Sequence, residues 1–321
     1  MSKKLKILII RYSSIGDIIL ATPVIRCLKN QQKAEIHFIT KKCYSQLLEE
    51  NPYLSKLYFI ETVNIDELKR NSYDYIIDLH NNLRSNILSF KLSKKTIRYN
   101  KSNFKKMLLI IFGINLLDKK HVVERYMDTL KKINTKNDEI GLEYFLPNNY
   151  KTPISFKKEY ILWAIGASYF NKQLPIERIV EVSEKIKYPI ILLGGKSDFQ
   201  RANKIIELSN NKNIINYCHS NDFHDSAKLI KESKIVFTND TGMMHVASAF
   251  KKPIISFWGC TKPFQGFSPY CNENSLELIV SSKSKNPCSK HGKFCKYNKK
   301  CINYITSNEI IKAYQKLIFK K

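Results

Sequence analysis

No segment of the 321-residue sequence reaches the roughly 18 consecutive apolar residues that a membrane-spanning helix needs. The basic start Met1–Lys6 is similar to that of a signal peptide, but the apolar run Ile7–Ile10 behind it is too short and ends at Arg11. We therefore expect a cytoplasmic protein, in a compartment that normally keeps thiols reduced. The eight cysteines then need roles other than disulfide formation.

The sequence also lacks the GxGxxG motif of dinucleotide-binding folds and the Walker motif of P-loop proteins. These absences argue against a nicotinamide-dependent dehydrogenase and against a P-loop NTPase. Arginine is scarce beside lysine, although dedicated phosphate and base recognition favours arginine. The formal net charge is nevertheless +26, which attracts phosphorylated lipids, nucleotides or nucleic acid. A coding bias towards Lys, Asn and Ile produces the same surplus, and both explanations stay open.

The sequence does contain enough apolar side chains for folded cores, with a hydrophobic fraction of 43% and an aromatic fraction of 12%. Its length exceeds the size at which single cores usually stop growing, so two domains are expected. Apolar runs of strand length alternate with helix-like patterns, fade in a polar linker from Thr135 to Lys158, and then resume. This alternation predicts an α/β fold with two parallel sheets covered on both faces. The predicted strands are Leu5–Arg11, Glu35–Thr40, Lys56–Ile60, Tyr73–Leu79, Tyr160–Ile165, Pro189–Leu193, Asn213–Asn216, Lys234–Thr238 and Pro253–Trp258.

Ligands of such sheets bind beyond the carboxyl ends of the strands, so the loop Ser13–Asp17 after the first strand is a candidate site. Gly16 permits a tight turn or a close approach of a ligand, and Asp17 supplies a carboxylate. Spacing alone favours a helix-capping role for Asp17 over a catalytic one. In the helix pattern that follows, Pro23 predicts a kink or a second helix start.

The polar run Thr238–His245 follows a strand in the second half and opens a helix. Backbone N–H groups at a helix start, with no side chain at Gly242, suit a diphosphate. Asp240 would repel a phosphate, so a sugar hydroxyl is the better partner for it, while His245 lies one turn into the helix. The alternative is a capping run with a histidine that is satisfied in the core.

Two further loops of the second half carry small residues at strand ends. Gly166-Ala167-Ser168 precedes Lys172, whose charge is able to stabilise a departing diphosphate. One lysine proves little in a chain so rich in lysine. Gly194-Gly195 precedes Asp198, a carboxylate placed to hold ribose hydroxyls.

Taken together and in this order, the motifs resemble those of glycosyltransferase family 9, the ADP-heptose–lipopolysaccharide heptosyltransferases. The resemblance runs from Lys6 to about Lys312. Each motif is weak alone, but their order and spacing are specific. The segments that carry the resemblance are Ile7–Asp17 with Thr22-Pro23, Asp78–Ser85, Gly166–Ser168 with Lys172 and Pro175, and Thr238–Ala249 with Lys252-Pro253 and the aromatic loop to Tyr270.

The resemblance implies a GT-B architecture, in which two Rossmann-like domains face each other across a cleft. Residues 1–150 would form the acceptor-side domain and residues 151–305 the nucleotide-sugar domain, with a helix in 306–321 returning towards the first. It also implies that Asp17 is the general base of an inverting sugar transfer, which reverses the preference for capping. Such a base accepts the proton of the acceptor hydroxyl, and the chemistry requires no cofactor.

The site residues that the resemblance implies fall into two groups. Two departures from the family pattern bear on donor contacts, because Leu174 replaces a common tryptophan and Met243 a frequent proline. The donor-binding positions are Ser168, Lys172, Asp198, Asp240, Thr241, Gly242 and His245, and the acceptor-binding positions are Ser14, Gly16, Arg84 and Arg125.

The partners that the resemblance implies are a nucleotide-sugar donor and an anionic glycolipid acceptor at the inner-membrane surface. The segment 105–120 holds mostly apolar residues between two lysine pairs, and it could enter a headgroup layer through Leu109 and Ile111. A buried helix of the first domain is the more common meaning of so short an apolar run.

A cluster of metal-binding side chains lies near the C-terminus. Cys288, His291, Cys295 and Cys301 offer three thiolates and an imidazole, a set able to hold one structural zinc. Autotransporter heptosyltransferases, which resemble this family, carry iron bound by cysteines. Plain reduced cysteines are the alternative.

Two other functions stay open. One keeps the fold but uses a different nucleotide sugar or a protein acceptor. The other is a basic nucleic-acid-binding protein, which is motivated by charge alone. That class requires basic residues clustered with stacking aromatics or a known binding module. The sequence shows neither, so no nucleic-acid partner is expected.

Overall fold

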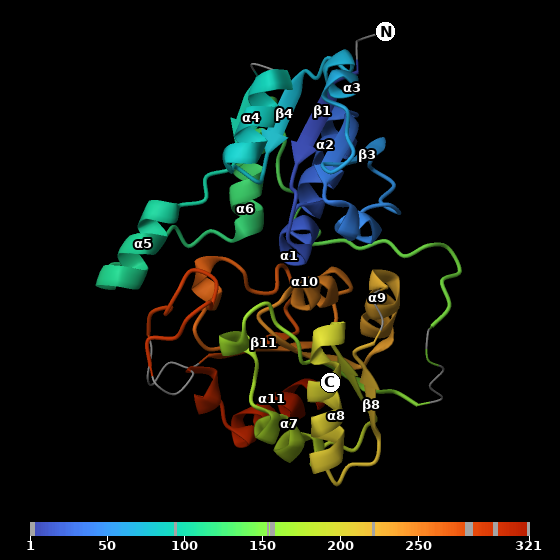
Figure 1. Cartoon of the computed structure of the whole chain (residues 1–321), viewed down its shortest axis with the longest axis vertical. Helices are drawn as coiled ribbons and strands as arrows, with labels where there is room; N and C mark the ends of the chain where they lie inside the picture. Colours follow the sequence, from blue (N-terminus) through green and yellow to red (C-terminus); the bar gives the residue numbers. More distant parts are fainter. Residues whose placement is uncertain are drawn as a thin grey trace. The chain divides into compact units, whose positions relative to one another are not determined.

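The computed structural model describes residues 4–92, 95–152, 154, 158–219, 222–279, 285–297 and 301–319 (Figure 1). The chain forms two compact units. Unit 1 consists of Met1–Lys101 with Lys120–Pro147, and unit 2 consists of Ser102–Lys119 with Asn148–Lys321. The change of unit at Pro147 falls within the polar stretch that the sequence indicates as a linker. Segment 102–119, which precedes that linker, nevertheless belongs to unit 2.

Unit 1 is built on a five-stranded sheet with the order β3-β2-β1-β4-β5. All of its strand pairs are parallel, as predicted. The strands are β1 (Lys6–Ile10), β2 (Glu35–Thr40), β3 (Lys56–Phe59), β4 (Tyr75–Asp78) and β5 (Thr96–Arg98). The helices are α1 (Ile15–Ile19), α2 (Thr22–Gln32), α3 (Ile65–Arg70), α4 (Leu83–Leu92) and α6 (Val122–Met127), with the 3₁₀ helices η1 (Lys42–Leu47) and η2 (Asp128–Ile133).

The helix pattern around Pro23 divides into two helices, α1 and α2. The first ends at Ile19, and the second begins at Thr22 with Pro23 in its first turn. Proline is accepted there because the first N–H groups of a helix have no partner within the helix. The second helix start that Pro23 predicts is therefore confirmed.

Unit 2 is built on a six-stranded parallel sheet with the order β11-β10-β9-β6-β7-β8. Its strands are β6 (Ile161–Ala164), β7 (Ile190–Leu193), β8 (Ile214–Tyr217), β9 (Ile235–Asn239), β10 (Ile254–Trp258) and β11 (Ser275–Ile279). Its helices are α5 (Asn103–Phe112), α7 (Ile176–Ser183), α8 (Phe199–Leu208), α9 (Phe223–Glu232), α10 (Gly242–Ala249) and α11 (Ser307–Ile318), with the 3₁₀ helices η3 (Phe170–Lys172), η4 (Lys196–Asp198), η5 (Pro263–Gln265) and η6 (Cys301–Tyr304).

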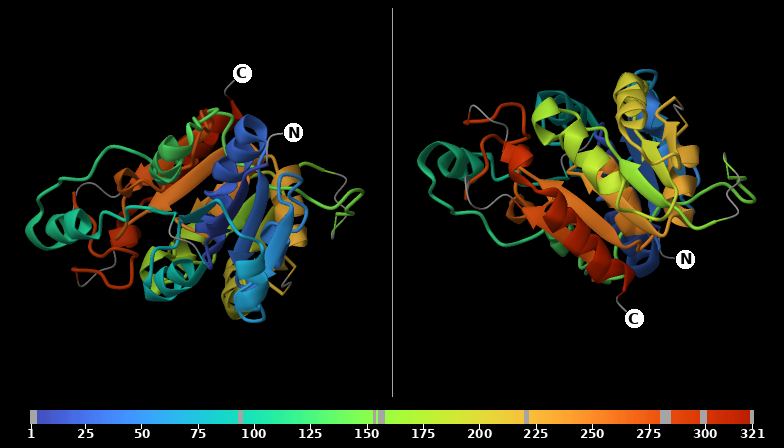
Figure 2. Two further views of the ribbon diagram at one scale, coloured as in Figure 1. Left: turned by 90° about the horizontal axis from the view of Figure 1, so that it is seen from above. Right: turned by 90° about the horizontal axis from the view of Figure 1, so that it is seen from below.

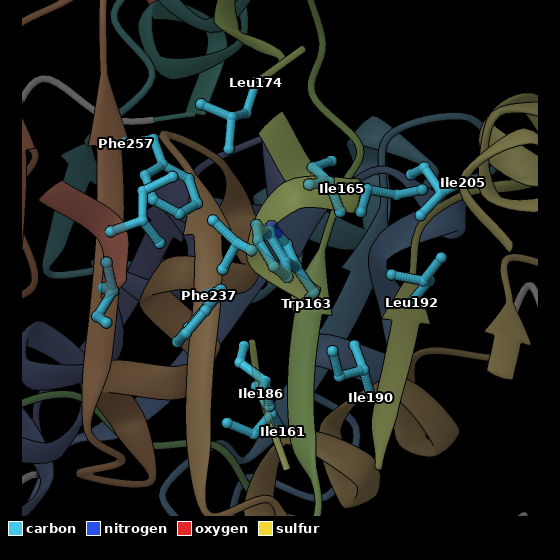
Figure 3. Close-up of a cluster of buried hydrophobic side chains, with 14 of the residues drawn as sticks. Ile161, Trp163, Ile165, Leu174, Ile186, Ile190, Leu192, Ile205, Phe237 and Phe257 are labelled. Carbon is cyan, nitrogen blue, oxygen red and sulfur yellow. The ribbon is translucent and has the colours of Figure 1, made fainter. Parts of the chain in front are cut away.

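The core of unit 2 is aromatic at its centre. Trp163 on β6 lies with its ring 4.8 Å from that of Phe237 on β9. Isoleucine and leucine side chains surround this pair over the strands (Figure 3). The ring of Tyr314 on α11 lies 6.1 Å from Phe237, so the C-terminal helix contributes to the same core. From below, α11 lies beside the strands of the second sheet (Figure 2). The C-terminal helix α11 thus packs against the core of unit 2.

Helix α5 differs from the buried helix of the first domain that an apolar run of this length usually forms. It belongs to unit 2, where Lys290 Nζ donates a hydrogen bond of 2.6 Å to Asn103 Oδ1. Leu109 is buried, whereas Phe104, Ile111 and Phe112 are exposed. Leu109 is therefore not available for insertion into a membrane, and Ile111 is. Within the described residues, none of the helices is long and apolar enough to cross a bilayer.

Candidate active site

Asp17 occupies the third position of α1, just beyond the carboxyl end of β1. Its Oδ2 atom accepts hydrogen bonds from Ser14 N at 3.2 Å and Ser14 Oγ at 2.9 Å. The same oxygen lies 2.5 Å from Arg11 Nη2. Tyr126 donates its hydroxyl proton to Asp17 Oδ1 at 3.4 Å. Asp17 thus closes the start of the helix, as spacing alone suggested, and it also forms a buried ion pair.

The surroundings of Asp17 keep the carboxyl ionised. Burial works to raise the pKa of Asp17, but the Arg11 guanidinium and the hydrogen bonds from Ser14 outweigh it, so the pKa lies below its ordinary value. Arg11 is held in turn by Leu79, whose carbonyl oxygen accepts a hydrogen bond of 2.6 Å from Nη1. The site therefore offers a fixed negative charge at neutral pH.

Sheet register explains why residues so far apart in sequence meet here. Ile10 on β1 lies opposite Asp78 on β4, so the loops after the two strands adjoin. Asp78 organises the second loop, because its carboxylate accepts hydrogen bonds from the backbone N–H groups of His80 and Asn81 and from Ser85 Oγ. Parallel strands place such loops at one edge of the sheet.

His80 lies in this second loop, beside the ion pair. Its ring centroid is 4.9 Å from that of Tyr12. Burial, followed by the charge of Arg11, lowers the pKa of His80 to about 4, so the imidazole is neutral at physiological pH. Sequence reasoning did not single out Arg11, His80 or Tyr126 as site residues. Arg11 and His80 could have been found as polar residues that follow the end of an apolar strand.

The expected acceptor residues lie on three elements of unit 1. Ser14 and Gly16 flank the start of α1, and Gly16 is buried. Arg84 is exposed on α4 and lies close enough to Tyr12 to lower the pKa of that phenol, although burial raises it overall. Arg125 is nearly buried on α6, next to Tyr126. Tyr126 contacts Asp17, so Ser14, Gly16 and Arg125 lie near the ion pair, whereas Arg84 lies near Tyr12.

In unit 2 the central pair is Lys172 with Asp240. Lys172 Nζ lies 2.7 Å from Asp240 Oδ2, and both side chains are mostly buried. Thr261 donates its hydroxyl proton to the same oxygen at 2.7 Å. The structure thus brings together two predicted donor residues and one, Thr261, that sequence reasoning missed. It also provides a counter-charge for Asp240, which would otherwise repel a diphosphate.

Asn239, at the end of β9, connects three loops of this edge. Its amide nitrogen donates hydrogen bonds to the carbonyl oxygens of Ile165 at 3.0 Å and Gly166 at 3.1 Å. Its side-chain oxygen accepts one from Leu174 N at 3.2 Å. Leu174, where a tryptophan is common, is fully buried in the core of unit 2. Asn239 belongs to the polar run Thr238–His245 that the sequence singles out, but its contacts with these loops were not predicted.

The expected diphosphate cradle lies at the start of α10. Thr241 is its N-cap residue, Gly242 its first residue, and His245 is buried in the first turn. Ser168 is exposed in the loop after β6. The backbone N–H groups of this helix start are the kind of donors that bind phosphate oxygens.

Asp198 is held by the loops that surround it. Its Oδ2 atom accepts a hydrogen bond of 3.0 Å from Gly195 N. A Cβ atom at Gly166 would lie 2.4 Å from this oxygen, and one at Gly194 would lie 2.8 Å from Asp198 Cβ. Only glycine fits at both positions, so the two glycines permit the close packing of this carboxylate.

Four cysteines gather in unit 2, and the set differs from the one predicted. The sulfur atoms of Cys260, Cys288, Cys295 and Cys301 all lie within 4.8 Å of one another. Cys288 Sγ lies 3.4 Å from Cys301 Sγ, and Cys295 Sγ lies 3.3 Å from it. The inclusion of His291 in the ligand set was wrong, because this exposed residue lies outside the cluster and Cys260 takes the fourth place.

The backbone explains how Cys260 joins the set. Cys288 N donates a hydrogen bond of 2.9 Å to the Cys260 carbonyl oxygen. Cys260 follows Gly259, where a Cβ atom would lie 2.7 Å from Ile302 N, so only glycine lets the segment with Cys301 come so close. Four sulfur ligands of one zinc ion lie about 3.8 Å apart when Zn–S bonds are about 2.3 Å long. The observed sulfur distances fit such an ion.

The protein-family model described as glycosyltransferase family 9 (heptosyltransferase) matches residues 64–299. The chain belongs to this family. It is therefore an enzyme, a glycosyltransferase with the GT-B fold, and the expected family and fold are confirmed.

Individual relatives are distant but span nearly the whole chain. Lipopolysaccharide heptosyltransferase 1 of Campylobacter coli is 24% identical, with 98% of this chain and 99% of that protein covered. ADP-heptose lps heptosyltransferase II of E. coli has a similar structure, with a TM-score of 0.73, 20% identity, and coverage of 98% of this chain and 99% of that one. The iron-containing dodecameric glycosyltransferase TibC of enterotoxigenic E. coli has a TM-score of 0.64 and 11% identity, with coverage of 98% and 80%. These structural similarities show the fold.

Proposed function

We propose that the protein transfers a heptose from ADP-heptose to a lipopolysaccharide core or a related glycan, with inversion at the anomeric carbon and Asp17 as the general base. The observation that carries the proposal is the half-buried, ionised carboxylate of Asp17 at the carboxyl edge of the first sheet. The relatives named above, a lipopolysaccharide heptosyltransferase and an ADP-heptose lps heptosyltransferase, support the donor and the acceptor.

The reaction follows from the groups at each sheet edge. The acceptor hydroxyl attacks the anomeric carbon, its proton passes to Asp17, and the bond to the diphosphate breaks so that ADP leaves. One base on the face opposite the leaving group gives inversion, by the same geometric logic as in inverting glycosidases. Oδ2 already has three partners, so we infer that Oδ1 receives the proton.

On the donor side we propose that Lys172 contacts the diphosphate while it stays beside Asp240. A lysine charge and the backbone N–H groups of Thr241 and Gly242 would then stabilise the negative charge that develops on ADP. Asp240, paired with the lysine, would accept a hydrogen bond from a hydroxyl of the sugar. Ser168, Asp198 and His245 are the further donor contacts that we propose. Unit 2 is accordingly the donor-binding unit and unit 1 the acceptor unit.

For the acceptor we propose contacts with Ser14, Gly16 and Arg125, which lie near Asp17, and with Arg84, which lies near Tyr12. Arginine binds carboxylates and phosphates through paired N–H groups, and anionic glycolipids carry such groups. Arg84 is exposed and is therefore the residue most accessible to an acceptor.

We also propose that the α5 patch rests on an anionic membrane. We define this patch as Phe104, Met107, Ile111 and Phe112 of α5, with Ile114 and Leu116 of the loop that follows, all of which are exposed. Residues 285–297, which contact α5, contain four lysines and no acidic residue. Apolar side chains beside lysines are the combination that binds the headgroup layer of anionic lipids.

We propose that the four-cysteine cluster holds one structural metal ion, zinc or iron. Four thiolates suit either metal. TibC, a structurally similar glycosyltransferase, contains iron, which supports the choice of iron, and the sulfur spacing supports zinc as well. Such an ion would crosslink Cys260 to the segment 288–301.

The experiment that tests the reaction compares Asp17→Asn with the wild-type protein. A panel of nucleotide sugars is offered with and without lipopolysaccharide core acceptors, and ADP or other nucleotide release is followed. We expect ADP-heptose to be the productive donor, and we expect Asp17→Asn to lower turnover by roughly 10²–10⁴-fold while ADP still binds. Asp66→Asn, on the exposed face of α3, is the matched control and keeps wild-type turnover. Near-wild-type turnover in Asp17→Asn would remove Asp17 from the mechanism.

A further inference from the structure

Gly292 lies directly against the side chain of Lys172. A Cβ atom at Gly292 would come within 2.7 Å of Lys172 Cγ and 2.8 Å of Lys172 Cδ. Its backbone has φ +79°, a conformation that L side chains rarely adopt. Beside this contact, Asn171 Nδ2 donates a hydrogen bond of 3.0 Å to the Lys293 carbonyl oxygen. The loop that contains Gly292 therefore supports the stem of Lys172, and only glycine fits there.

A second contact fixes the tip of the same lysine. Lys172 Nζ lies 2.7 Å from Asp240 Oδ2, and Thr261 donates its hydroxyl proton to that oxygen at 2.7 Å. The Thr261 methyl group also lies within 3.7 Å of the position of a Cβ atom at Gly292. Thr261 and Gly292 thus approach the lysine from two segments of the chain.

Both segments are attached to the cysteine cluster. Thr261 directly follows Cys260, and Gly292 lies between Cys288 and Cys295. Residues 285–297 form neither a helix nor a strand. Their shape therefore depends on side-chain contacts and on whatever crosslinks the four sulfur atoms. A displacement of the sulfur atoms would therefore move Thr261, which is bonded to Cys260, and the short loop that contains Gly292. Both of these lie beside Lys172 or its partner Asp240.

We propose that the metal-crosslinked cysteine cluster positions Lys172 for the donor diphosphate, with Gly292 and Thr261 as the positioning residues that connect the two. The proposal rests on the proposed function, in which Lys172 contacts the diphosphate. The cluster itself contacts no substrate. Loss of the metal would leave the sheet intact, release the loop 288–295, and weaken the binding of ADP.

The test measures ADP affinity by titration calorimetry and metal content by elemental analysis. Gly292→Ala is expected to raise the Kd for ADP about tenfold while the metal content stays at the wild-type level. Gly113→Ala is the matched control, since Gly113 has a similar φ of +74° but its Cβ atom would meet only the flexible Asn286 side chain. This control is expected to bind ADP as the wild type does. An unchanged Kd in Gly292→Ala would overturn the proposal.

A double-mutant cycle shows whether the effect passes through Lys172. In a Lys172→Ala background, Gly292→Ala should weaken ADP binding no further, because the group that it displaces is gone. Additive losses would overturn the proposal. Thr261→Val should also raise the Kd, whereas Thr261→Ser, which retains the hydroxyl, should restore it. This pair provides the same test if Gly292→Ala does not fold.

Cys295→Ser tests the connection to the metal. This variant should lose the metal in either background. It should raise the Kd for ADP when Lys172 is present but not when Lys172 is replaced by alanine. Wild-type ADP binding in a metal-free Cys295→Ser protein would overturn the metal connection.

A readout that does not depend on ADP is the NMR signal of Lys172 after ¹³C-dimethylation of the lysines. This signal is assigned by comparison with Lys172→Arg. If the wild type bound no ADP, the proposed function would fail, and a shift of this signal in Gly292→Ala would still support the positioning contact. An unmoved signal would overturn it.

Discussion

Arg11 and Asp17 form a close ion pair, with Nη2 of the guanidinium 2.5 Å from Oδ2 of the carboxylate. Arg11 directly follows β1, and Asp17 is the third residue of α1. The pairing keeps the proposed base charged, but it also makes the carboxylate less basic. A base with a lowered pKa remains ionised at low pH, but it accepts a proton less favourably than a base with the ordinary pKa. Arg11 therefore controls the acid side of the pH dependence.

We predict that Arg11→Met moves the acid limb of the pH–rate profile upward. Activity requires ionised Asp17, and the ionised fraction falls as the pH drops through its pKa. In the wild type the pKa of Asp17 lies below its ordinary value, so the acid limb of the profile lies at a lower pH than for an ordinary aspartate. Without Arg11, burial dominates and raises the pKa, so activity disappears at a higher pH. The expected result is an acid limb of kcat/KM that lies at a higher pH than in the wild type.

The control for this prediction is Arg70→Met, which removes an exposed arginine from α3. Its profile should match that of the wild type. An acid limb that stays in place in Arg11→Met would mean that a group other than Asp17 titrates there.

The strands of this fold follow from sequence, because buried parallel strands are short apolar runs. All nine predicted strands are present. Two others were missed. β5 is only three residues long, and β11 is an edge strand in which Glu277 interrupts the apolar run. A strand buried on one face gives a weaker pattern than one buried on both.

Only part of the site could be predicted from the sequence, because some of its residues lie in recognisable motifs and others do not. Asp17, Lys172 and Asp240 were identified because each lies in a motif. Thr261 and Cys260 lie outside these motifs. Asn239 lies in the same run as Asp240, but the sequence does not show its contacts with the loop after β6. Their importance arises from sheet register, which places Ala164 opposite Thr238 and so brings the loops after β6 and β9 together. Register joins segments that are about 70 residues apart, and a single sequence does not reveal it.

We predict that the metal content distinguishes the two ligand sets. Cys260→Ser should lose the metal, because it removes one of four converging sulfur atoms. His291→Ala should retain it, because His291 lies outside the cluster. The measurement is elemental analysis of each purified protein against its concentration. Equal metal loss in both variants would contradict the four-cysteine site, and a metal-free wild type would leave the cysteines as plain thiols.

We predict that Arg26→Met destabilises unit 1. The buried Arg26 on α2 makes two hydrogen bonds of 2.7 Å to Asp138 and lies 2.7 Å from Glu143. It therefore anchors the final segment of unit 1 to the sheet through α2. Removing it leaves two partly buried carboxylates unpaired, a change that costs about 3–5 kcal/mol.

Hydrogen exchange of the β1 and α2 amides is the measurement for this prediction, since both tryptophans lie in unit 2 and their fluorescence does not report on unit 1. Lys69→Met, which breaks an exposed ion pair with Asp66, should cost no more than about 1 kcal/mol. Equal protection in the two variants would show that the Arg26 pairs contribute little.

The α5 patch gives the last prediction, which concerns where the protein works. Ile111→Glu with Phe112→Glu places two negative charges on residues that are 60% and 66% exposed, so the fold should persist. The variant should lose co-sedimentation with vesicles that contain anionic phosphatidylglycerol, because charge repulsion and lost apolar contact both oppose binding. Wild-type protein should bind these anionic vesicles. It should bind vesicles of neutral phosphatidylcholine weakly or not at all.

The matched control is Leu208→Glu with Phe319→Glu, which changes two exposed apolar residues of unit 2 outside the patch. These substitutions add the same charge, so a general electrostatic effect would weaken both variants equally. Retained binding in the control and loss in the patch variant would locate the contact at α5. If neither variant lost binding, the lysine surplus alone would account for attraction to the membrane. If the wild type instead self-associated through the patch and the variant was monomeric, the patch would be an interface between copies of this chain.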